Sequence, residues 1–184
     1  MSAIKKQWNN LRFLLIKPYL DLNDTVILKD IHRWKEILRL SGDDEQILKQ
    51  LLNGYKEFRN LYIYRNGHRK YYWRLVKAFY RPLDSLWITT PRIGGGLFIQ
   101  HGFSTYIAAE SIGENCWINQ MVNIGYKDDG RPARLGSNVT VACGAVVVGD
   151  ITVGDNSIIG ANAVVTKDVA PGSVMGGVPA HKLN

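Results

Sequence analysis

Cysteine, histidine and long apolar runs are scarce in this sequence of 184 residues, which contains two cysteines and four histidines. Cys116 and Cys143 lack the CxxC spacing of zinc and redox motifs, so we expect reduced, buried thiols and no metal site. No apolar run approaches the ~20 residues needed to span a bilayer. The first ten residues also lack the long apolar region of a signal peptide. Together these absences favour a cytoplasmic protein.

Positive charge is concentrated in the first half of the chain. Residues 1–92 contain 18 Lys and Arg against 9 Asp and Glu, whereas residues 93–184 contain 5 against 7. Such an asymmetry predicts regions of different character. We expect an α-helical region over residues 1–85, a β-rich domain over 86–170 and a C-terminal tail over 171–184.

Helical periodicity and turn residues define four segments of the first region. A helix is expected after a capping residue at 23 or 24, because apolar residues follow at helical spacing, namely Ile27, Ile31, Trp34 and Leu38. A second helix is expected from about Asp43 to Gly54, with its acidic residues in the first turn. Two more are expected at about 55–65 and 68–80, before Pro82.

Residues 59–81 combine seven Lys and Arg with seven aromatic residues and contain no acidic residue. Two explanations remain open. The aromatic rings can pack against the β-rich domain while the charges stay in water, or the stretch can lie against an anionic inner-membrane surface or an anionic substrate. No nucleic-acid recognition motif accompanies the charge, so nucleic acid is not an expected partner.

An aliphatic residue returns every sixth position in the second half of the chain, at Ile112, Ile118, Ile124, Leu135, Val141, Val147, Val153, Ile159 and Val165. A period of six fits neither an α-helix nor a flat strand. It is typical of a parallel β-helix, in which one side chain in six points into a narrow interior. Gly or another small residue usually follows the inward residue, and Asn or Gly falls two positions later, where a tight corner requires positive φ.

The repeat is interrupted twice. It begins in an earlier register, with Ile93, Ile99 and Thr105 as inward residues, and shifts by one residue before Ile112. Between the two registers lies His101, the only histidine in the body of the repeat. The second interruption is a polar loop at residues 126–134, and such excursions often carry functional residues.

Four short segments resemble the hexapeptide-repeat acyltransferases, in their serine O-acetyltransferase-like branch. They are Ile99-Gln100-His101-Gly102, the Arg131-Pro132 of the loop, residues 160–168 (GANAVVTKD) and residues 177–180 (GVPA). The resemblance covers residues 93–184. It implies a mainly β protein with a left-handed parallel β-helix, acetyl-CoA as co-substrate and a homotrimer with active sites between neighbouring subunits. It also implies that His101 is the general base, a role that suits the pKa of histidine.

Two substitutions distinguish this chain from serine acetyltransferases. Gln100 replaces the Asp that precedes their catalytic histidine, and Arg131-Pro132 replaces His-Pro. Their aspartate partner of the histidine would fall near Leu86, two residues from Asp84. In the galactoside and xenobiotic acetyltransferases the catalytic histidine falls at the position of Tyr126. We therefore take Gln100, Tyr126 and Arg131 as candidate substrate contacts, and the acceptor as a hydroxyl of serine or of a sugar in surface-polysaccharide biosynthesis.

A row of small residues would allow the thin pantetheine arm of acetyl-CoA to approach the backbone closely. The candidate groove residues are Ala142, Cys143, Gly144, Gly160 and Ala161. The resemblance implies that Ala161, Thr166 and Lys167 contact the coenzyme, with Lys182 supplying charge. Corner geometry and solvated surface explain the same residues without a ligand. The alternative function is a catalytically silent trimeric β-helix that acts as a scaffold or binding module.

Overall fold

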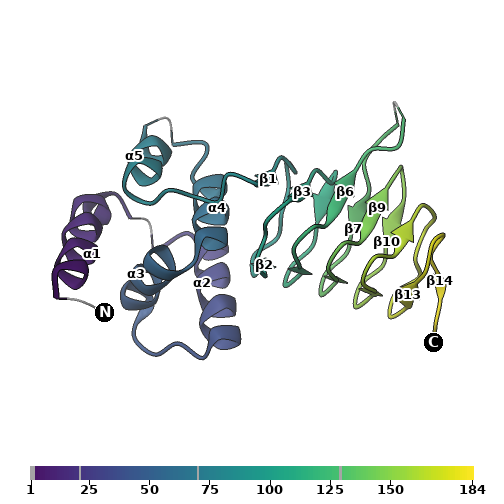
Figure 1. Cartoon of the computed structure of the whole chain (residues 1–184), viewed down its shortest axis with the longest axis horizontal. Helices are drawn as coiled ribbons and strands as arrows, with labels where there is room; N and C mark the ends of the chain where they lie inside the picture. The colour runs from purple at the N-terminus through teal and green to yellow at the C-terminus, as the bar shows by residue number, and fades with distance from the viewer. Residues whose placement is uncertain (1–2, 21, 70, 129) are drawn as a thin grey trace. The chain divides into compact units, whose positions relative to one another are not determined.

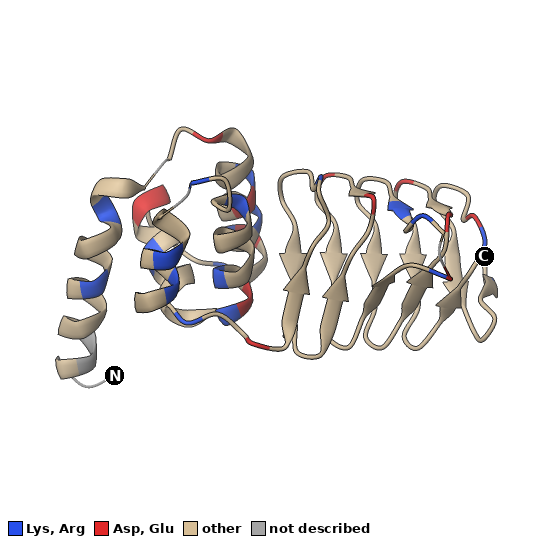
Figure 2. Ribbon diagram, turned by 90° about the horizontal axis from the view of Figure 1, so that it is seen from above, with Lys and Arg blue, Asp and Glu red and all other residues tan. Residues whose placement is uncertain are grey.

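The computed structural model describes residues 3–20, 22–69, 71–128 and 130–184. The chain divides into two compact units, Met1–Pro82 and Leu83–Asn184. The first unit is built from helices and the second from short strands wound into coils (Figure 1). Figure 2 shows basic residues on the helices of the first unit, whereas the strands of the second carry few charged residues.

The helical unit contains α1 (Ala3–Ile16), the 3-10 turn η1 (Lys17–Tyr19), α2 (Thr25–Leu38), α3 (Asp44–Gly54), α4 (Lys56–Arg65) and α5 (Tyr72–Phe79). Asp24 and Asp43 cap α2 and α3, the latter in a reciprocal capping box with Gln46. These two predicted starts are confirmed. α5 is shorter than predicted, because Arg69 N–H donates to Asn66 O (3.0 Å) and closes a turn before it. None of the helices in the described ranges is long and apolar enough to cross a membrane.

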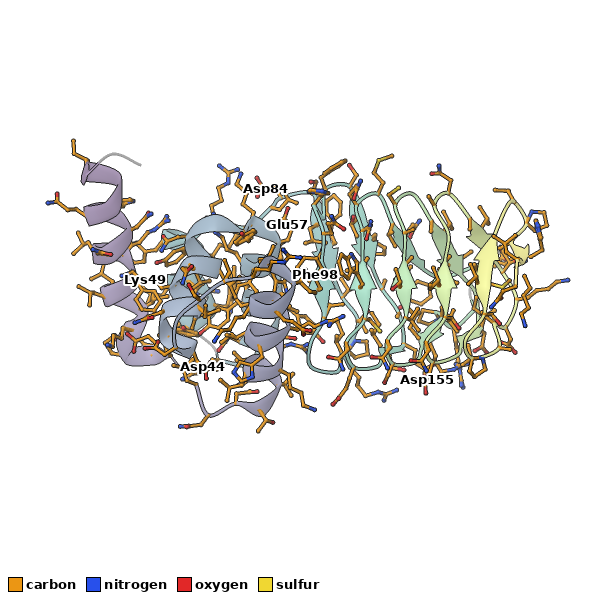
Figure 3. All side chains as sticks on the ribbon, turned by 90° about the horizontal axis from the view of Figure 1, so that it is seen from below. Asp44, Lys49, Glu57, Asp84, Phe98 and Asp155 are labelled. Carbon is orange, nitrogen blue, oxygen red and sulfur yellow. The ribbon has the colours of Figure 1, made fainter. Side chains whose placement is uncertain are left out.

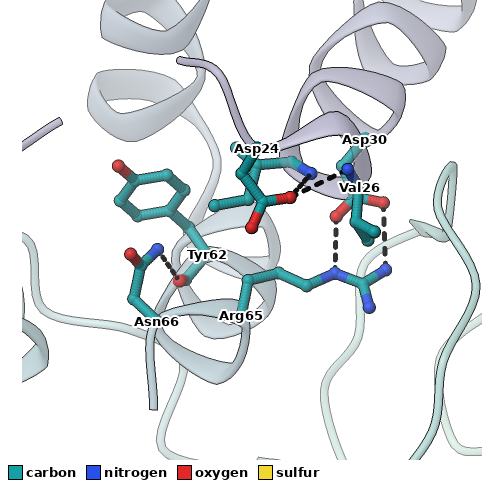
Figure 4. Close-up of polar contacts among 7 residues, drawn as sticks. Asp24, Val26, Asp30, Tyr62, Arg65 and Asn66 are labelled. Atoms are coloured by element: carbon teal, nitrogen blue, oxygen red, sulfur yellow. Dashed lines mark hydrogen bonds and ion pairs between the residues drawn. The ribbon is translucent and has the colours of Figure 1, made fainter. Parts of the chain in front are cut away.

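Buried aromatic and aliphatic side chains hold the helices of this unit together. Trp34 meets Phe58 edge-on at 5.2 Å between ring centroids, and both are at most 1% exposed. Beside this core, Arg65 of α4 donates to both carboxylate oxygens of Asp30 of α2 at 2.8 and 3.2 Å (Figure 4). The pair is almost completely buried, with side chains 7% and 2% exposed.

Packing accounts for much of the basic, aromatic stretch at residues 59–81. Tyr62, Tyr72 and Tyr80 are buried. Arg59 donates to the carbonyl oxygens of Leu52, Asn53 and Arg81, where α3 ends and α5 has ended. Carbonyls at helix C-termini lack intrahelical donors, so the guanidinium stabilises them. The aromatic rings of Tyr62 and Tyr72 thus pack within the helical unit, where Tyr62 also stacks on Phe58, and Arg59 is bonded to carbonyl oxygens instead of being left to water.

Three parallel sheets form the walls of the second unit. Sheet A has the order β1-β3-β6-β9-β12, sheet B the order β10-β7-β4 and sheet C the order β14-β13-β11-β8-β5-β2. Each full coil visits sheets C, A and B in turn, as expected for a parallel β-helix, which confirms the predicted fold class. The strands are β1 (Leu86–Ile88), β2 (Phe98–Ile99), β3 (Thr105–Ile107), β4 (Ser111–Ile112), β5 (Trp117–Ile118), β6 (Asn123–Gly125), β7 (Arg134–Leu135), β8 (Thr140–Val141), β9 (Val146–Val148), β10 (Thr152–Val153), β11 (Ile158–Ile159), β12 (Val164–Val165), β13 (Val174–Gly176) and β14 (His181–Lys182).

The interior of the coils is filled by the residues that the six-residue period selects. All nine aliphatic residues from Ile112 to Val165 are at most 3% exposed. They stack in register from coil to coil, for example Ile118 on Val141 in sheet C and Ile124 on Val147 in sheet A. One predicted inward residue is wrong: Ile107, not Thr105, stacks on Ile124. The reason is a longer turn after Ile99, and Thr105 instead donates its hydroxyl to Phe103 O (3.1 Å).

The corners are fixed by left-handed backbone and by side chains that bond to the next coil. At the corners from sheet B to sheet C and from sheet C to sheet A, the residue three positions after an inward residue adopts positive φ, as at Gly144 (71°) and Asn162 (56°). Asp155 lies at one corner (Figure 3), where its carboxylate accepts from the Ser137 N–H (2.7 Å). Ser137 Oγ in turn accepts from the Glu114 N–H (3.1 Å).

Candidate active site

His101 lies in the first coil at the corner between sheets C and A, in the turn that joins β2 to β3. The step between stacked inward residues is eight positions here, from Ile99 to Ile107, but six in the next coil, from Ile118 to Ile124. The two extra residues make a turn in which His101, Gly102 and Ser104 have φ values of 64°, 54° and 51°. Positive φ at a non-glycine residue costs free energy, so this turn is a specific feature of the first coil.

The His101 side chain is exposed, and within the described ranges its ring has neither a hydrogen bond nor an ion pair. Both ring nitrogens can therefore face a ligand. Leu86, at the position near which the resemblance puts an aspartate, is instead buried in β1 opposite Thr105. No carboxylate at that position can orient the ring.

Gln100 is held beside His101 by an aromatic pair. Trp117 Nε1 donates to Gln100 Oε1 at 3.2 Å, and the Trp117 ring meets Phe98 edge-on at 4.7 Å. Because the carbonyl oxygen accepts this bond, the amide NH₂ of Gln100 is the group that can donate to a substrate. A neutral donor therefore stands where serine acetyltransferases are expected to carry a carboxylate.

Side chains along the corner between sheets C and A become smaller from the first coil to the last. One position beyond the stacked inward residues of sheet C the series runs Gln100, Asn119, Ala142, Gly160 and Gly176; two positions beyond, it runs His101, Gln120, Cys143, Ala161 and Gly177. The structure thus brings six of the predicted residues, from Gln100 to Ala161, to one corner, with Gly144 just beyond. We call this set of stacked positions the corner column.

Gln120 belongs to the corner column and was missed by the sequence interpretation. Its Oε1 atom is buried and, among the described residues, has no hydrogen-bond partner. An unsatisfied buried carbonyl is costly unless something donates to it. The place of Gln120 in the corner column could have been predicted from the repeat, because Gln120 lies two positions after Ile118, just as His101 lies two positions after Ile99.

Stacking of coils explains the two glycines of this corner without any ligand. A Cβ atom on Gly144 would lie 2.1 Å from Asn162 Oδ1, and one on Gly160 would lie 2.9 Å from Met175 O. Both distances are too short for a real side chain.

The two cysteines lie in different environments. Cys143 is half-buried at the same corner, whereas Cys116 is buried elsewhere. Burial raises the pKa of the Cys116 thiol to about 11. Cys116 is therefore a protonated, unreactive thiol.

The remaining predicted residues lie away from this corner. Thr166 and Lys167 follow β12 at the corner between sheets A and B, where they line a pocket of about 100 Å³ together with Val165, Met175, Pro179 and Ala180. The tail closes over this end of the coil, because Ala180 N–H donates to Val164 O (2.8 Å). Lys182 lies on β14, which pairs antiparallel with β13.

Tyr126 and Arg131 project from the loop between β6 and β7, also at a corner between sheets A and B, and both are exposed. Asp129 of this loop lies outside the described residues. Within one chain, sheet A therefore separates Tyr126 and Arg131 from His101. In the described ranges, no group of three His, Cys, Asp or Glu residues could hold a metal ion.

Comparison with known proteins identifies the repeat. Residues 132–167 match the family described as bacterial transferase hexapeptide (six repeats). The serine acetyltransferase of Synechococcus elongatus is 40% identical over 96 residues, which are 50% of this chain and 39% of that protein. The chain thus spans less than half the length of the curated relatives that it matches.

Solved structures share the fold over most of the chain. A Neisseria gonorrhoeae serine acetyltransferase in complex with serine is 23% identical, with a TM-score of 0.62 over 89% of this chain and 71% of that one. A serine acetyltransferase in complex with CoA is 24% identical, with a TM-score of 0.61 over 84% and 67%. The second unit is thus a hexapeptide-repeat β-helix. The chain as a whole resembles serine acetyltransferases in this repeat and in its fold.

Proposed function

We propose that this protein is an O-acetyltransferase that transfers the acetyl group of acetyl-CoA to a substrate hydroxyl. The observation that carries the proposal is the lengthened turn that presents the exposed side chain of His101 at the head of the corner column, with no hydrogen bond to either ring nitrogen among the described residues. Sequence similarity of half the chain to serine acetyltransferases supports the reaction type. The solved relative in complex with CoA supports acetyl-CoA as co-substrate.

In this proposal the neutral His101 ring accepts the proton of the acceptor hydroxyl as its oxygen attacks the thioester carbonyl carbon. The new C–O bond gives a tetrahedral oxyanion, whose collapse breaks the C–S bond. The protonated His101 then gives its proton to the departing thiolate. The acetyl group passes directly to the acceptor in this proposal, because Cys116 is buried and protonated and Cys143 is separated from His101 by Gln120 in the corner column.

The coenzyme contacts are proposed along the corner column and, separately, at the pocket that follows β12. Ala142, Cys143, Gly160 and Ala161 leave space beside the coils, since their side chains are small or absent. Thr166 and Lys167 are proposed to hold the coenzyme at the terminal pocket, with Lys182 supplying positive charge for its phosphates. Gly144 is required by coil stacking and needs no ligand to explain it.

The acceptor is proposed to be a hydroxyl of a sugar in surface-polysaccharide biosynthesis, with serine as the other candidate. Gln100 offers a neutral amide donor, which suits a sugar hydroxyl better than the ammonium group of serine. Arg131 and Tyr126 are proposed as further acceptor contacts from a neighbouring subunit of a homotrimer. The relative crystallised with serine keeps serine as the first compound to test.

The test is CoA release from acetyl-CoA in the presence of serine or candidate sugars. His101→Ala should lower turnover by ~10² to 10⁴, the range for loss of a general base, while acetyl-CoA affinity stays nearly unchanged. His68→Ala is the matched control, because His68 is an exposed histidine of the helical unit. Full activity of His101→Ala together with loss of activity in Tyr126→Phe would move the chemistry to the loop. If no acceptor releases CoA, a silent scaffold or binding module is the better description.

A further inference from the structure

Helix α1 carries apolar residues on two of its faces, and only one face is buried. Phe13 and Ile16 pack into the helical unit, where they are 3% and 0% exposed. A second set lies on the opposite side at the spacing i, i+4, i+7 and i+11, which places its members within one narrow stripe. Its members are Ile4, Trp8, Leu11 and Leu15, with Leu14 beside them, and their exposed fractions range from 45% to 79%.

Exposed aromatic rings continue this apolar surface beyond the end of α1. Tyr19 of η1 and Tyr71, just before α5, are 53% and 69% exposed. They belong to neighbouring elements, because Arg69 Nη1 donates to Tyr19 O (3.0 Å) and the Tyr19 ring lies 6.3 Å from that of Tyr72. Exposed apolar side chains gathered on neighbouring elements in this way mark a contact with a partner or a lipid surface. We call the five α1 residues and the two tyrosines the apolar patch.

The charges on the elements that carry the apolar patch are positive. α1 contains three Lys and Arg and no acidic residue. Figure 2 accordingly shows blue but no red segments on the helix that begins the chain. α5 contacts α1 through the bond from Arg12 Nη1 to Phe79 O and exposes Arg74 and Lys77, again with no acidic residue. Of the flanking cations, Lys17 is neutralised by Glu45 of α3 (2.8 Å).

We propose that the apolar patch docks the protein onto an anionic lipid surface, with α1 lying in the plane of the membrane interface. Apolar side chains in one stripe, aromatic rings at its border and cations without acids are the features of interfacial helices. A surface of the same sign on a second copy would repel, whereas anionic headgroups complement it. At 14 residues α1 is about 21 Å long, too short to span a bilayer. The proposal is independent of the proposed acetyl transfer. It centres the membrane contact on α1, and the stretch 59–81 contributes only Tyr71 and the two α5 cations.

The test is co-flotation of the full chain with vesicles of phosphatidylcholine containing 30% phosphatidylglycerol, compared with vesicles of phosphatidylcholine alone. We expect binding to the anionic vesicles and its reduction by 0.5 M salt. Trp8→Gln/Leu11→Gln should weaken partitioning at least tenfold, because both side chains are about half exposed in the free protein. Gln7→Asn/Asn10→Gln, which changes exposed polar residues of the same helix, should leave it unchanged.

Circular dichroism and light scattering on the same samples distinguish the remaining outcomes. The variants should keep the wild-type spectrum, melting curve and molecular mass. Absence of binding to anionic vesicles, or binding that Trp8→Gln/Leu11→Gln does not weaken, overturns the proposal. A fall in molecular mass of that variant in solution overturns it as well, because the apolar patch would then be covered by a second copy of the chain.

Discussion

Removal of one partner of the buried ion pair between Asp30 and Arg65 should destabilise the helical unit strongly. The two side chains form a bidentate pair at 2.8 and 3.2 Å and are nearly inaccessible to water (Figure 4). Arg65→Met leaves the Asp30 carboxylate buried without its cation, for which we expect a loss of about 3–5 kcal/mol in the free energy of unfolding. For a unit of this size, ~3 kcal/mol corresponds to a fall of about 12 °C or more in melting temperature.

The assay is thermal and urea unfolding followed by far-UV circular dichroism at pH 7. The double variant Asp30→Leu/Arg65→Met should recover much of the loss, because it removes the buried charge as well as its partner. Glu45→Ala is the matched control, since the Lys17–Glu45 pair has the same 2.8 Å distance but side chains 50% and 39% exposed. We expect a change below about 1 kcal/mol for it. A loss below about 1 kcal/mol for Arg65→Met would show that the reasoning from burial is wrong.

Two further outcomes are expected. Lys167→Ala should raise the KM for acetyl-CoA and leave kcat little altered, because it removes binding shared by the ground and transition states. An unchanged KM in steady-state kinetics would contradict this expectation. Stability should fall between about pH 9 and pH 11, since the raised pKa of Cys116 means that the unfolded chain releases the thiol proton first as pH rises. The loss is ~2–3 kcal/mol, because burial raises the pKa of the Cys116 thiol from its ordinary value to about 11. Urea unfolding of Cys116→Ala at pH 8 and pH 10.5 should show a smaller difference between the two pH values than the unmodified chain does.

The β-helix and its interior could be predicted because a six-residue period is a direct consequence of coil geometry. Each coil buries one aliphatic residue per sheet, so the buried residues from Ile112 to Val165 can be identified from their spacing in the sequence. The turn at His101 breaks this regular spacing, and Thr105 was therefore assigned wrongly as an inward residue. Thr105 lies six positions after Ile99 and Ile107 lies eight, and the spacing alone cannot show that the turn at His101 contains two extra residues.

Helix starts were predictable from capping side chains, but the surface of α1 was not. Asp24 and Asp43 mark their helices through local bonds that depend on few neighbours. In α1, apolar residues occur on two faces, so periodicity does not indicate which face packs and which stays exposed. Only the tertiary packing of Phe13 and Ile16 decides it.

The separation of the candidate residues over two corners has a consequence for assembly. Gln100 and His101 lie at the corner where the chain enters sheet A, and Tyr126 and Arg131 lie in the loop where the chain leaves sheet A. The coils are tied by ladder hydrogen bonds and a close-packed interior, so one chain cannot bring the two groups together. If both groups contact one acceptor, the loop must come from a neighbouring subunit.

Mixed trimers test this directly. His101→Ala and Arg131→Ala chains should each be impaired alone, and equal amounts co-expressed should recover up to about a quarter of wild-type activity, because each site needs an intact His101 from one chain and an intact Arg131 from the next. His101→Ala mixed with a double His101→Ala/Arg131→Ala chain is the control and should recover nothing. Recovery no greater than the sum of the separate variants would mean that His101 and Arg131 do not act on one acceptor across a subunit boundary, and the loop would lose its proposed role in the site.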